Sequence, residues 1–277
     1  MLRDKLVHKV LRIPHALHVG VDRTGADIEA PTIVLIHGLA RTHKVWNLAL
    51  KDLPSSSRVI AVDLLGFGES PKPDWRSYNA EEQAISLHTT LRKCGVTGDI
   101  IIVGHSLGAL VAIEYAKKYP ARLKSLILCS TPLYKSEPRY VFNKFKLPDG
   151  ETFYKSMLRN FREKPDFTKK LNYYARRAKF IDEDFVVDDK NMRSVVRSIE
   201  MAIENQSAFE WLIETKVPTS LVYGRLDPYV IKKYYKTLAK HNPNVAVYPI
   251  VAAHEINRSK PYADAVRSLL FAQNPEV

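Results

Sequence analysis

The stretch IIIVGHSLG, residues 100–108, places a serine in a tight turn between two expected elements of regular structure. Its first four residues are apolar and β-branched, which predicts a buried strand. Apolar residues at helical spacing continue from 107 to 115 and predict a helix. Gly104 and Gly108 flank Ser106 in the spacing Gly-x-Ser-x-Gly. Because glycines let neighbouring backbone come close, we expect a strained strand-to-helix turn that exposes the serine hydroxyl.

Short apolar runs of strand length recur along the chain, with helical patterns between them. A run that is apolar at every position, rather than at alternate positions, predicts a strand that is buried on both faces of the sheet. The alternation predicts a doubly wound, mostly parallel α/β sheet. We also expect antiparallel strands at Leu6–Val10 and Ala16–Val21. The other runs are Thr32–Ile36, Val59–Val62, Leu126–Cys129, Ser220–Tyr223 and Val245–Val251.

The alternation of strand and helix stops between residues 131 and 215. This segment holds 14 of the chain's 27 aromatic residues, and its apolar residues show helical spacing from Met192 to Ile203. It is too long for a loop in a compact domain. We interpret residues 131–215 as a helical insertion into a core formed by residues 1–130 and 216–277.

The composition of the 277 residues is that of a soluble globular protein, with 45% hydrophobic and 26% charged residues. Two cysteines, Cys94 and Cys129, are too few for a disulfide framework. Charges interrupt the first 14 residues, so no signal peptide is expected. No apolar run is long enough for a transmembrane helix. These features predict a cytoplasmic protein.

The net charge of +12 is unevenly distributed in the insertion. Residues 131–179 carry 13 basic and 5 acidic side chains, whereas residues 180–215 carry 3 and 9. The basic half could steer anionic substrates or rest on a peripheral anionic membrane surface. The alternative is two complementary solvated helix faces. Only the net charge would suggest nucleic-acid binding, so we expect no nucleic-acid partner.

Two further motifs stand at the ends of expected strands. One is VLIHGL at residues 34–39, and the other is DLLGFGES at residues 63–70. Together with the serine turn, they occur in the order typical of the α/β-hydrolase family, which this sequence resembles over about residues 30–130 and 215–270. The resemblance implies an α/β-hydrolase fold in which the helical insertion is a lid (cap).

The resemblance also implies a catalytic triad in the order serine, acid, histidine. Ser106 would be the nucleophile. His254 would be the base, because it follows the last apolar run. Asp227, in the loop after residues 220–223, would be the acid. The other acid position used in the family falls on Ser130 and Thr131, which carry no carboxylate.

The backbone N–H groups of Leu39 and Leu107 would form the oxyanion hole by the same resemblance. His37 and His105 are expected to have structural roles, bracing the oxyanion loop and packing behind the turn. Arg41 and Trp46 follow this loop and could line the pocket, although a salt bridge and a core aromatic are equally consistent with the pattern. Glu255 is poorly placed to orient the ring of its neighbour His254.

The leading hypothesis is a serine hydrolase, carboxylesterase-like, that cleaves a carboxylic ester, thioester or lactone of a small-molecule acyl substrate through an acyl-enzyme. Alternatives are acyl transfer, C–C hydrolysis, cofactor-free perhydrolysis, or a ligand receptor with vestigial catalysis. The sequence has no P-loop, metal-ligand spacing or dinucleotide fingerprint, so no cofactor or metal is expected. Asp63 is interpreted as part of a structural turn.

Overall fold

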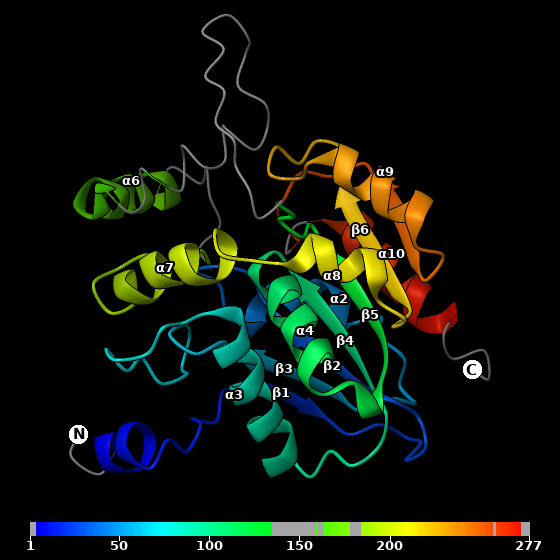
Figure 1. Cartoon of the computed structure of the whole chain (residues 1–277), viewed down its shortest axis with the longest axis horizontal. Coiled ribbons are helices and arrows are strands. Elements are labelled where there is room, and N and C mark those ends of the chain that lie inside the picture. The colour runs from blue at the N-terminus through cyan, green and yellow to red at the C-terminus, as the bar shows by residue number, and fades with distance from the viewer. Residues whose placement is uncertain (1–3, 135–158, 160–162, 178–183, 257–258, 273–277) are drawn as a thin grey trace, which may run out of the picture.

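A seven-stranded sheet forms the centre of the computed structural model, which describes residues 4–134, 159, 163–177, 184–256 and 259–272 (Figure 1). The strands are β1 (His18–Arg23), β2 (Thr32–Ile36), β3 (Val59–Asp63), β4 (Ile100–His105), β5 (Leu123–Cys129), β6 (Thr219–Gly224) and β7 (Val245–Ile250). They lie in the order β1-β3-β2-β4-β5-β6-β7. Only the β1–β3 pair is antiparallel among these neighbours, which confirms the mostly parallel sheet.

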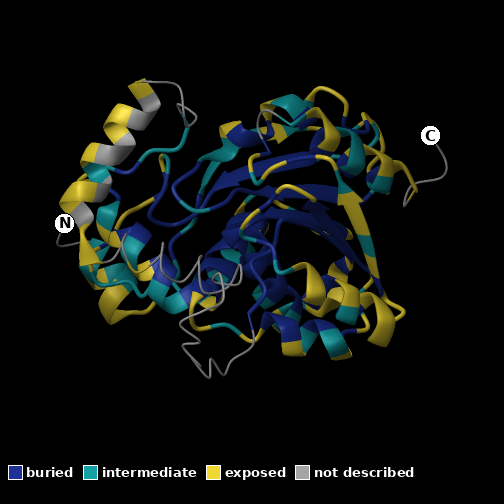
Figure 2. Cartoon of the chain, turned by 90° about the horizontal axis from the view of Figure 1, so that it is seen from above, coloured by how far each residue is buried: buried dark blue, intermediate teal, exposed yellow. Residues whose placement is uncertain are grey.

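Helices cover both faces of the sheet. The α-helices are α2 (Asn47–Leu50), α3 (Ala80–Lys93), α4 (Leu107–Lys118), α6 (Pro165–Arg177), α7 (Met192–Ser198), α8 (Ala208–Glu214), α9 (Lys232–His241) and α10 (Lys260–Ala272). Shorter or wider turns are η1 (Lys5–Val10), η2 (His43–Trp46), η3 (Pro120–Arg122) and η4 (Ile199–Ile203). Helices α3, α4, α8 and α9 bury side chains against one face, and α2 and α10 against the other. Figure 2 shows the buried sheet between them.

The central strands are apolar on both faces, as their sequence predicts. In β4, Ile100 and Ile102 belong to one apolar cluster, whereas Ile101 and Val103 belong to the other. Every residue of β2, β3 and β4 is buried. Each large apolar side chain buried in this way stabilises the fold by about 1.5–3 kcal/mol. The sheet therefore holds the ends of these strands rigidly.

The last strand departs from the expected burial. The run Val245–Val251 was expected to be buried on both faces, but in β7 only Val245 is fully buried. The reason is its place at the edge of the sheet, where one side of β7 has no neighbouring strand in the described part of the chain. Pro249 fits this position, because an edge strand tolerates a residue without a backbone N–H.

The expectation of a strand at Leu6–Val10 is wrong, because these residues lie in η1. The helical turn places the Nζ atoms of Lys5 and Lys9 each 6.0 Å from the centroid of the Trp75 ring. A spacing of four residues puts both lysines on one helix face, which a strand would not do. The second expected strand, at Ala16–Val21, corresponds to β1.

Between β5 and β6 the described elements are all helical, namely α6, α7, η4 and α8. Val195, Ile199 and Ile203 are buried together, as their helical spacing predicts. Phe209 packs in the core against Tyr234, with ring centroids 5.0 Å apart. Most of the basic half, residues 131–179, lies outside the described residues.

No helix in the described part of the chain is long and apolar enough to cross a membrane. Cys94 and Cys129 are both free thiols. Cys129 is buried in β5, and burial raises the pKa of its thiol.

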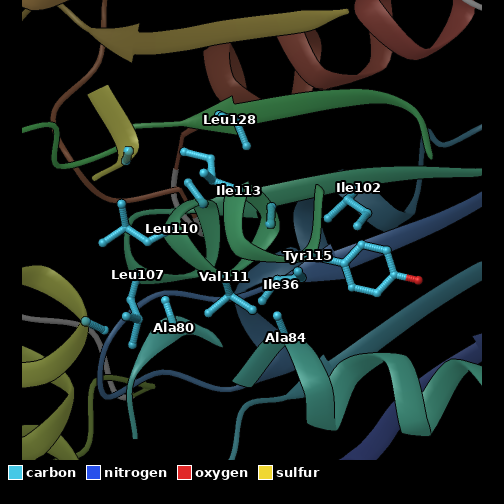
Figure 3. Packing of buried hydrophobic residues seen from close by; sticks show 14 of the residues in the cluster. Ile36, Ala80, Ala84, Ile102, Leu107, Leu110, Val111, Ile113, Tyr115 and Leu128 are labelled. Atoms are coloured by element: carbon cyan, nitrogen blue, oxygen red, sulfur yellow. The ribbon is translucent and has the colours of Figure 1, made fainter. Parts of the chain in front are cut away.

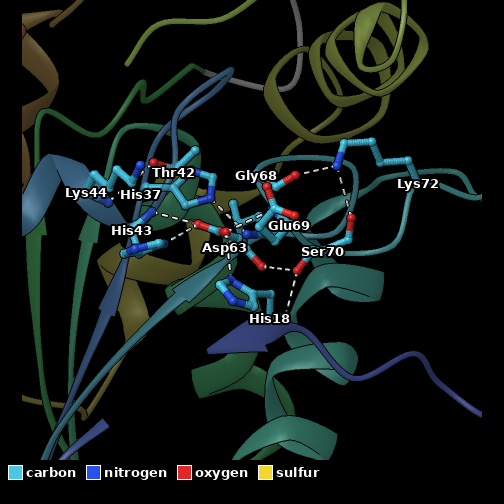
Figure 4. A network of polar contacts seen from close by, with 11 residues as sticks. His18, His37, Thr42, His43, Lys44, Asp63, Gly68, Glu69, Ser70 and Lys72 are labelled. Carbon is cyan, nitrogen blue, oxygen red and sulfur yellow. Dashed lines mark hydrogen bonds and ion pairs between the residues drawn. The ribbon is translucent and has the colours of Figure 1, made fainter. Parts of the chain in front are cut away.

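Asp63 ties three segments together at the end of β3 (Figure 4). Its carboxylate accepts hydrogen bonds from the Nδ1 atoms of His18 and His43, both at 2.9 Å. It also accepts from the backbone N–H groups of His43 at 2.7 Å and Glu69 at 3.0 Å. Burial alone would raise the pKa of Asp63, but these donors outweigh it and lower the pKa to about 2. The contacts support the structural interpretation of this motif.

Replacing Asp63 by Asn should destabilise the protein, because an amide oxygen cannot replace a carboxylate that accepts four N–H groups. Since the folded pKa of about 2 lies below the ordinary 3.8, Asp63 stabilises the fold above pH 4 and loses this contribution as the pH falls toward 2. The expected loss at neutral pH is at least about 2 kcal/mol. Urea unfolding of both proteins from pH 7 to pH 2 measures it. Asp52→Asn, at an exposed loop position, is the control, and an equal loss in that variant would contradict the assignment.

Candidate active site

Ser106 stands in a left-handed backbone conformation between β4 and α4. Its φ is 52° and its ψ is −116°, a strained region for a residue with a side chain. The turn is held by a hydrogen bond of 2.9 Å from the N–H of Ser106 to the carbonyl of Cys129. The strained turn expected from the sequence is therefore present.

Gly104 and Gly108 permit this turn by direct contact of backbone with backbone. A Cβ on Gly104 would lie 2.5 Å from the Gly108 carbonyl oxygen, and one on Gly108 would lie 2.4 Å from that of Ile36. Neither distance is compatible with a side chain. Figure 3 shows apolar side chains of α4, Leu107 and Val111 among them, in the cluster of buried residues that also holds Ile36 of β2.

The candidate acid and base are joined directly. Nδ1 of His254 lies 2.8 Å from Oδ2 of Asp227. Asp227 follows β6 and its side chain is fully buried, whereas 15% of the His254 side chain is exposed. Because the carboxylate can only accept, Nδ1 of the neutral imidazole carries the hydrogen, and Nε2 keeps its lone pair. The Nε2 atom is thus free to act as a base.

His254 and Asp227 each shift the pKa of the other. Burial works to lower the pKa of His254, but the charge and hydrogen bond of Asp227, helped by Glu255, outweigh it and raise the pKa above its ordinary 6.5. Burial works to raise the pKa of Asp227, but His254 and the hydrogen bonds to the carboxylate lower it overall. Asp227 therefore stays ionised, and His254 holds a proton more readily than an ordinary histidine.

A buried chain of hydroxyl groups supports Asp227 from behind. The N–H of Gly224 donates to Oη of Tyr262 at 2.8 Å. Oη of Tyr262 lies 2.5 Å from Oγ of Ser130, which lies 2.6 Å from Oδ2 of Asp227. Since the carboxylate can only accept, Ser130 donates to it, and Tyr262 must donate to Ser130. In the sequence, Ser130 stands out only as a position without a carboxylate, and no motif indicates Tyr262.

His105 connects the serine turn to the histidine loop. Its Nε2–H donates to the carbonyl of His254 at 2.9 Å, and the two rings lie 5.0 Å apart. Burial, and then the charge of His254, lower the pKa of His105 to about 3, so its ring is neutral. The structure thus brings the loop of His254 against the residue that precedes Ser106.

The loop of Leu39 also lies against the serine. His37 braces it: its Nε2 accepts from the N–H of Leu64 at 2.8 Å, and its Nδ1–H donates to the Gly38 carbonyl at 2.7 Å. Burial lowers the pKa of His37 to about 4. A Cβ on Gly38 would lie only 3.2 Å from Cβ of Ser106. Gly38 therefore lies directly against Ser106, and Leu39 is the next residue along the chain.

The two residues left open by the sequence are now placed. Trp46 is fully buried in the core. Arg41 is also buried and forms an ion pair with Glu255, beside His254. A salt bridge is one of the two alternatives that the sequence leaves open for Arg41, but the sequence does not indicate Glu255 as the partner, because the two residues lie far apart in the chain.

Two groups of side chains in the described part of the chain bring possible metal ligands within 4.8 Å of one another. They are Asp4 with His8 and His15, and His18 with His43 and Asp63. No metal-ligand spacing in the sequence predicts either group. In the second group, both carboxylate oxygens already accept N–H groups, which accounts for its geometry without an ion.

A family model described as alpha/beta hydrolase fold matches residues 31–256. The chain belongs to this family. Among curated relatives of this alpha/beta hydrolase, Lipase 1 of Psychrobacter immobilis is 26% identical over 263 residues, which cover 89% of the chain and 80% of the lipase. A (Lyso)-N-acylphosphatidylethanolamine lipase of Bos taurus is 29% identical over 146 residues. That match covers 50% of the chain and only 43% of the bovine protein.

Solved structures show the same fold. A thermophilic esterase from Thermogutta terrifontis has a TM-score of 0.67 and 23% identity, with 92% of this chain and 99% of the esterase covered. A haloalkane dehalogenase from Bradyrhizobium elkani has a TM-score of 0.71 and 18% identity, with coverage of 95% and 99%. At these identities the likeness concerns the fold alone. Family membership and the lipase relatives support a hydrolase.

The histidines of this alpha/beta hydrolase should titrate in a distinct order. His254 should protonate above pH 6.5, whereas His37 should stay neutral down to about pH 4 and His105 down to about pH 3. Two-dimensional NMR of the imidazole nitrogens over this pH range measures all three. Protonation of His105 near neutral pH, or of His254 below its ordinary 6.5, would contradict the described electrostatics.

Proposed function

We propose that this hydrolase is a serine hydrolase that cleaves a carboxylic ester, or a related acyl bond such as a thioester or lactone, through an acyl-enzyme on Ser106. The observation that carries the proposal is the hydrogen bond of 2.8 Å between Asp227 and His254, next to a strained serine turn. A serine hydroxyl needs such a base to become a nucleophile at neutral pH. The similarity to a bacterial protein named Lipase 1 supports an ester substrate.

In the proposed mechanism, Oγ of Ser106 attacks the acyl carbonyl carbon, while Nε2 of His254 takes the hydroxyl proton. Asp227 holds the ring and stabilises the imidazolium that forms. His254 then gives its proton to the leaving alcohol, and the acyl group remains on Ser106. A water molecule that loses its proton to His254 attacks the acyl carbonyl. The acid departs and Ser106 recovers its proton.

The N–H groups of Leu39 and Leu107 would stabilise the oxyanion of both tetrahedral intermediates. Two observations support this role. Leu107 is the first residue of α4, whose N-terminal N–H groups favour negative charge. Gly38, adjacent to Leu39, lies against Ser106. In the same proposal, the helical segment between β5 and β6 is a lid that excludes water from the active site.

Replacing Ser106 by Ala should abolish ester hydrolysis, because the nucleophile is removed while the fold is kept. The expected loss in kcat is about 10⁶-fold. A panel of p-nitrophenyl esters of increasing acyl length, with thioesters and lactones, measures the activity and the preferred substrate. Ser55→Ala is the matched control, since Ser55 lies in the exposed loop before β3, at the opposite end of the strand.

Native protein that turns over none of these substrates would contradict the proposal. Tight ligand binding that survives Ser106→Ala would then favour a receptor. Turnover in which an added alcohol or amine captures the acyl group would favour acyl transfer over hydrolysis.

The pH profile should report the base. Since only neutral His254 can accept a proton, kcat/KM should rise with pH through the pKa of His254, which lies above 6.5. Asp227→Asn should lower kcat about 10⁴-fold, because the amide no longer fixes the ring tautomer. Steady-state kinetics from pH 5 to pH 9 check both. An unchanged kcat in the Asn variant would rule out Asp227 as the acid.

A further inference from the structure

Arg41 and Glu255 form an ion pair across the edge of the sheet. Nη2 of Arg41 contacts Oε2 of Glu255 directly. Only 4% of the Arg41 side chain is exposed, against 45% of the Glu255 side chain. The guanidinium also lies over the ring of Phe185, 5.0 Å from its centroid. The pair is thus anchored on the arginine side and open to solvent on the glutamate side.

The pair joins two loops that the sheet keeps apart. Arg41 lies two residues after Leu39, in the loop that follows β2. Glu255 is adjacent to His254, in the loop that follows β7. Strands β4, β5 and β6 separate β2 from β7, so no backbone ladder connects these loops. The side chains of Arg41 and Glu255 make the connection instead.

The pair stays charged at neutral pH. An arginine keeps its charge even when buried, so it requires a carboxylate partner. Burial works to raise the pKa of Glu255, but Arg41 first, and then His254 and His105, lower it overall. Both charges are therefore present when His254 titrates.

In the described part of the chain, five groups contact the imidazole of His254 or act on its charge. Asp227 accepts its hydrogen bond, and the ring of Tyr229 packs on it at a centroid distance of 4.7 Å. His105 lies on the side of the serine turn and is neutral above about pH 3. Glu255 favours the imidazolium, whereas Arg41 disfavours it. The charges of the ion pair therefore oppose each other at His254.

We propose that Arg41 and Glu255 are positioning residues of the active site: their ion pair fixes the loop of Leu39 against the loop of His254 and balances the charge beside the imidazole. This inference rests on the proposed function of Ser106, Asp227 and His254. Neither residue needs to touch the reacting atoms. A shift of about 1 Å between the oxyanion donor and the base is enough to slow catalysis.

The test compares Arg41→Gln, Glu255→Gln and the double variant by kcat, KM and the pH dependence of kcat/KM. Each single variant should lose about 10- to 100-fold in kcat with a smaller change in KM. The reason is that the two loops lose their relative position, whereas the contacts that bind the substrate remain. The apparent pKa of the rising limb should move in opposite directions. It should fall in Glu255→Gln, which removes a negative charge, and rise in Arg41→Gln, which removes a positive one.

The double variant should return the apparent pKa close to that of the native enzyme, since both charges are gone, but should not recover kcat. Arg41→Lys keeps the charge without the planar fork, so it should keep the native pKa and recover part of kcat. Asp22→Asn and Arg58→Gln are the controls. Each of them breaks the ion pair of 2.7 Å between Asp22 of β1 and Arg58, the residue before β3. The apparent pKa of the rising limb of kcat/KM should stay unchanged in both controls.

Shifts of both single variants in the same direction, or kcat unchanged in both, would overturn the inference. NMR titration of His254 in each variant measures the charge balance independently of turnover and is also possible in the double variant, which leaves no unpaired charge. If native protein lacks turnover while the opposite shifts are seen by NMR, the proposed function fails and the electrostatic assignment stands. If native protein is active and the shifts are absent, this inference fails alone.

Discussion

Contact of backbone with backbone at Gly104 and Gly108 is the constraint on which the active-site arrangement depends. The carbonyl of Gly108 occupies the space where Gly104 would carry a Cβ, and the carbonyl of Ile36 does the same at Gly108. This closeness draws the start of α4 toward the end of β2. It also holds Ser106 at a φ of 52°, a strain of about 1–3 kcal/mol that the buried strands around it offset. Ala40 and Ser130 have positive φ on neighbouring loops, so strain gathers at this edge of the sheet.

Hydrogen-bond polarity organises the rest of the site. Fixed backbone donors decide the orientation of each group: Gly224 for the hydroxyls behind Asp227, and Leu64 for the ring of His37. The first network ends at the carboxylate of Asp227, and the second ends at the carbonyl oxygen of Gly38. Burial keeps His37 and His105 neutral, whereas the carboxylate of Asp227 raises the pKa of His254. Among His37, His105 and His254, it is therefore His254 that is suited to proton transfer.

Much of this could be predicted from sequence, because it depends on local patterns. Continuous apolar runs predicted β2 to β6, and the Gly-x-Ser-x-Gly spacing predicted the turn at Ser106. The order of motifs predicted that Asp227 and His254 would meet. The errors arose where tertiary contacts decide the outcome. Leu6–Val10 became helical against Trp75, and β7 became a half-exposed edge. The Arg41–Glu255 and Ser130–Tyr262 contacts join residues with no shared pattern, so no motif could have revealed them.

Trapping the acyl-enzyme shows whether the acyl group of the substrate passes through Ser106. Native protein mixed with an excess of a p-nitrophenyl ester, quenched in acid within milliseconds and analysed by intact and peptide mass spectrometry, should carry one acyl group. We expect this group on Ser106, and a burst of p-nitrophenol equal to the enzyme concentration if deacylation is the slower step. Rapid turnover with the acyl group on another residue would contradict this expectation.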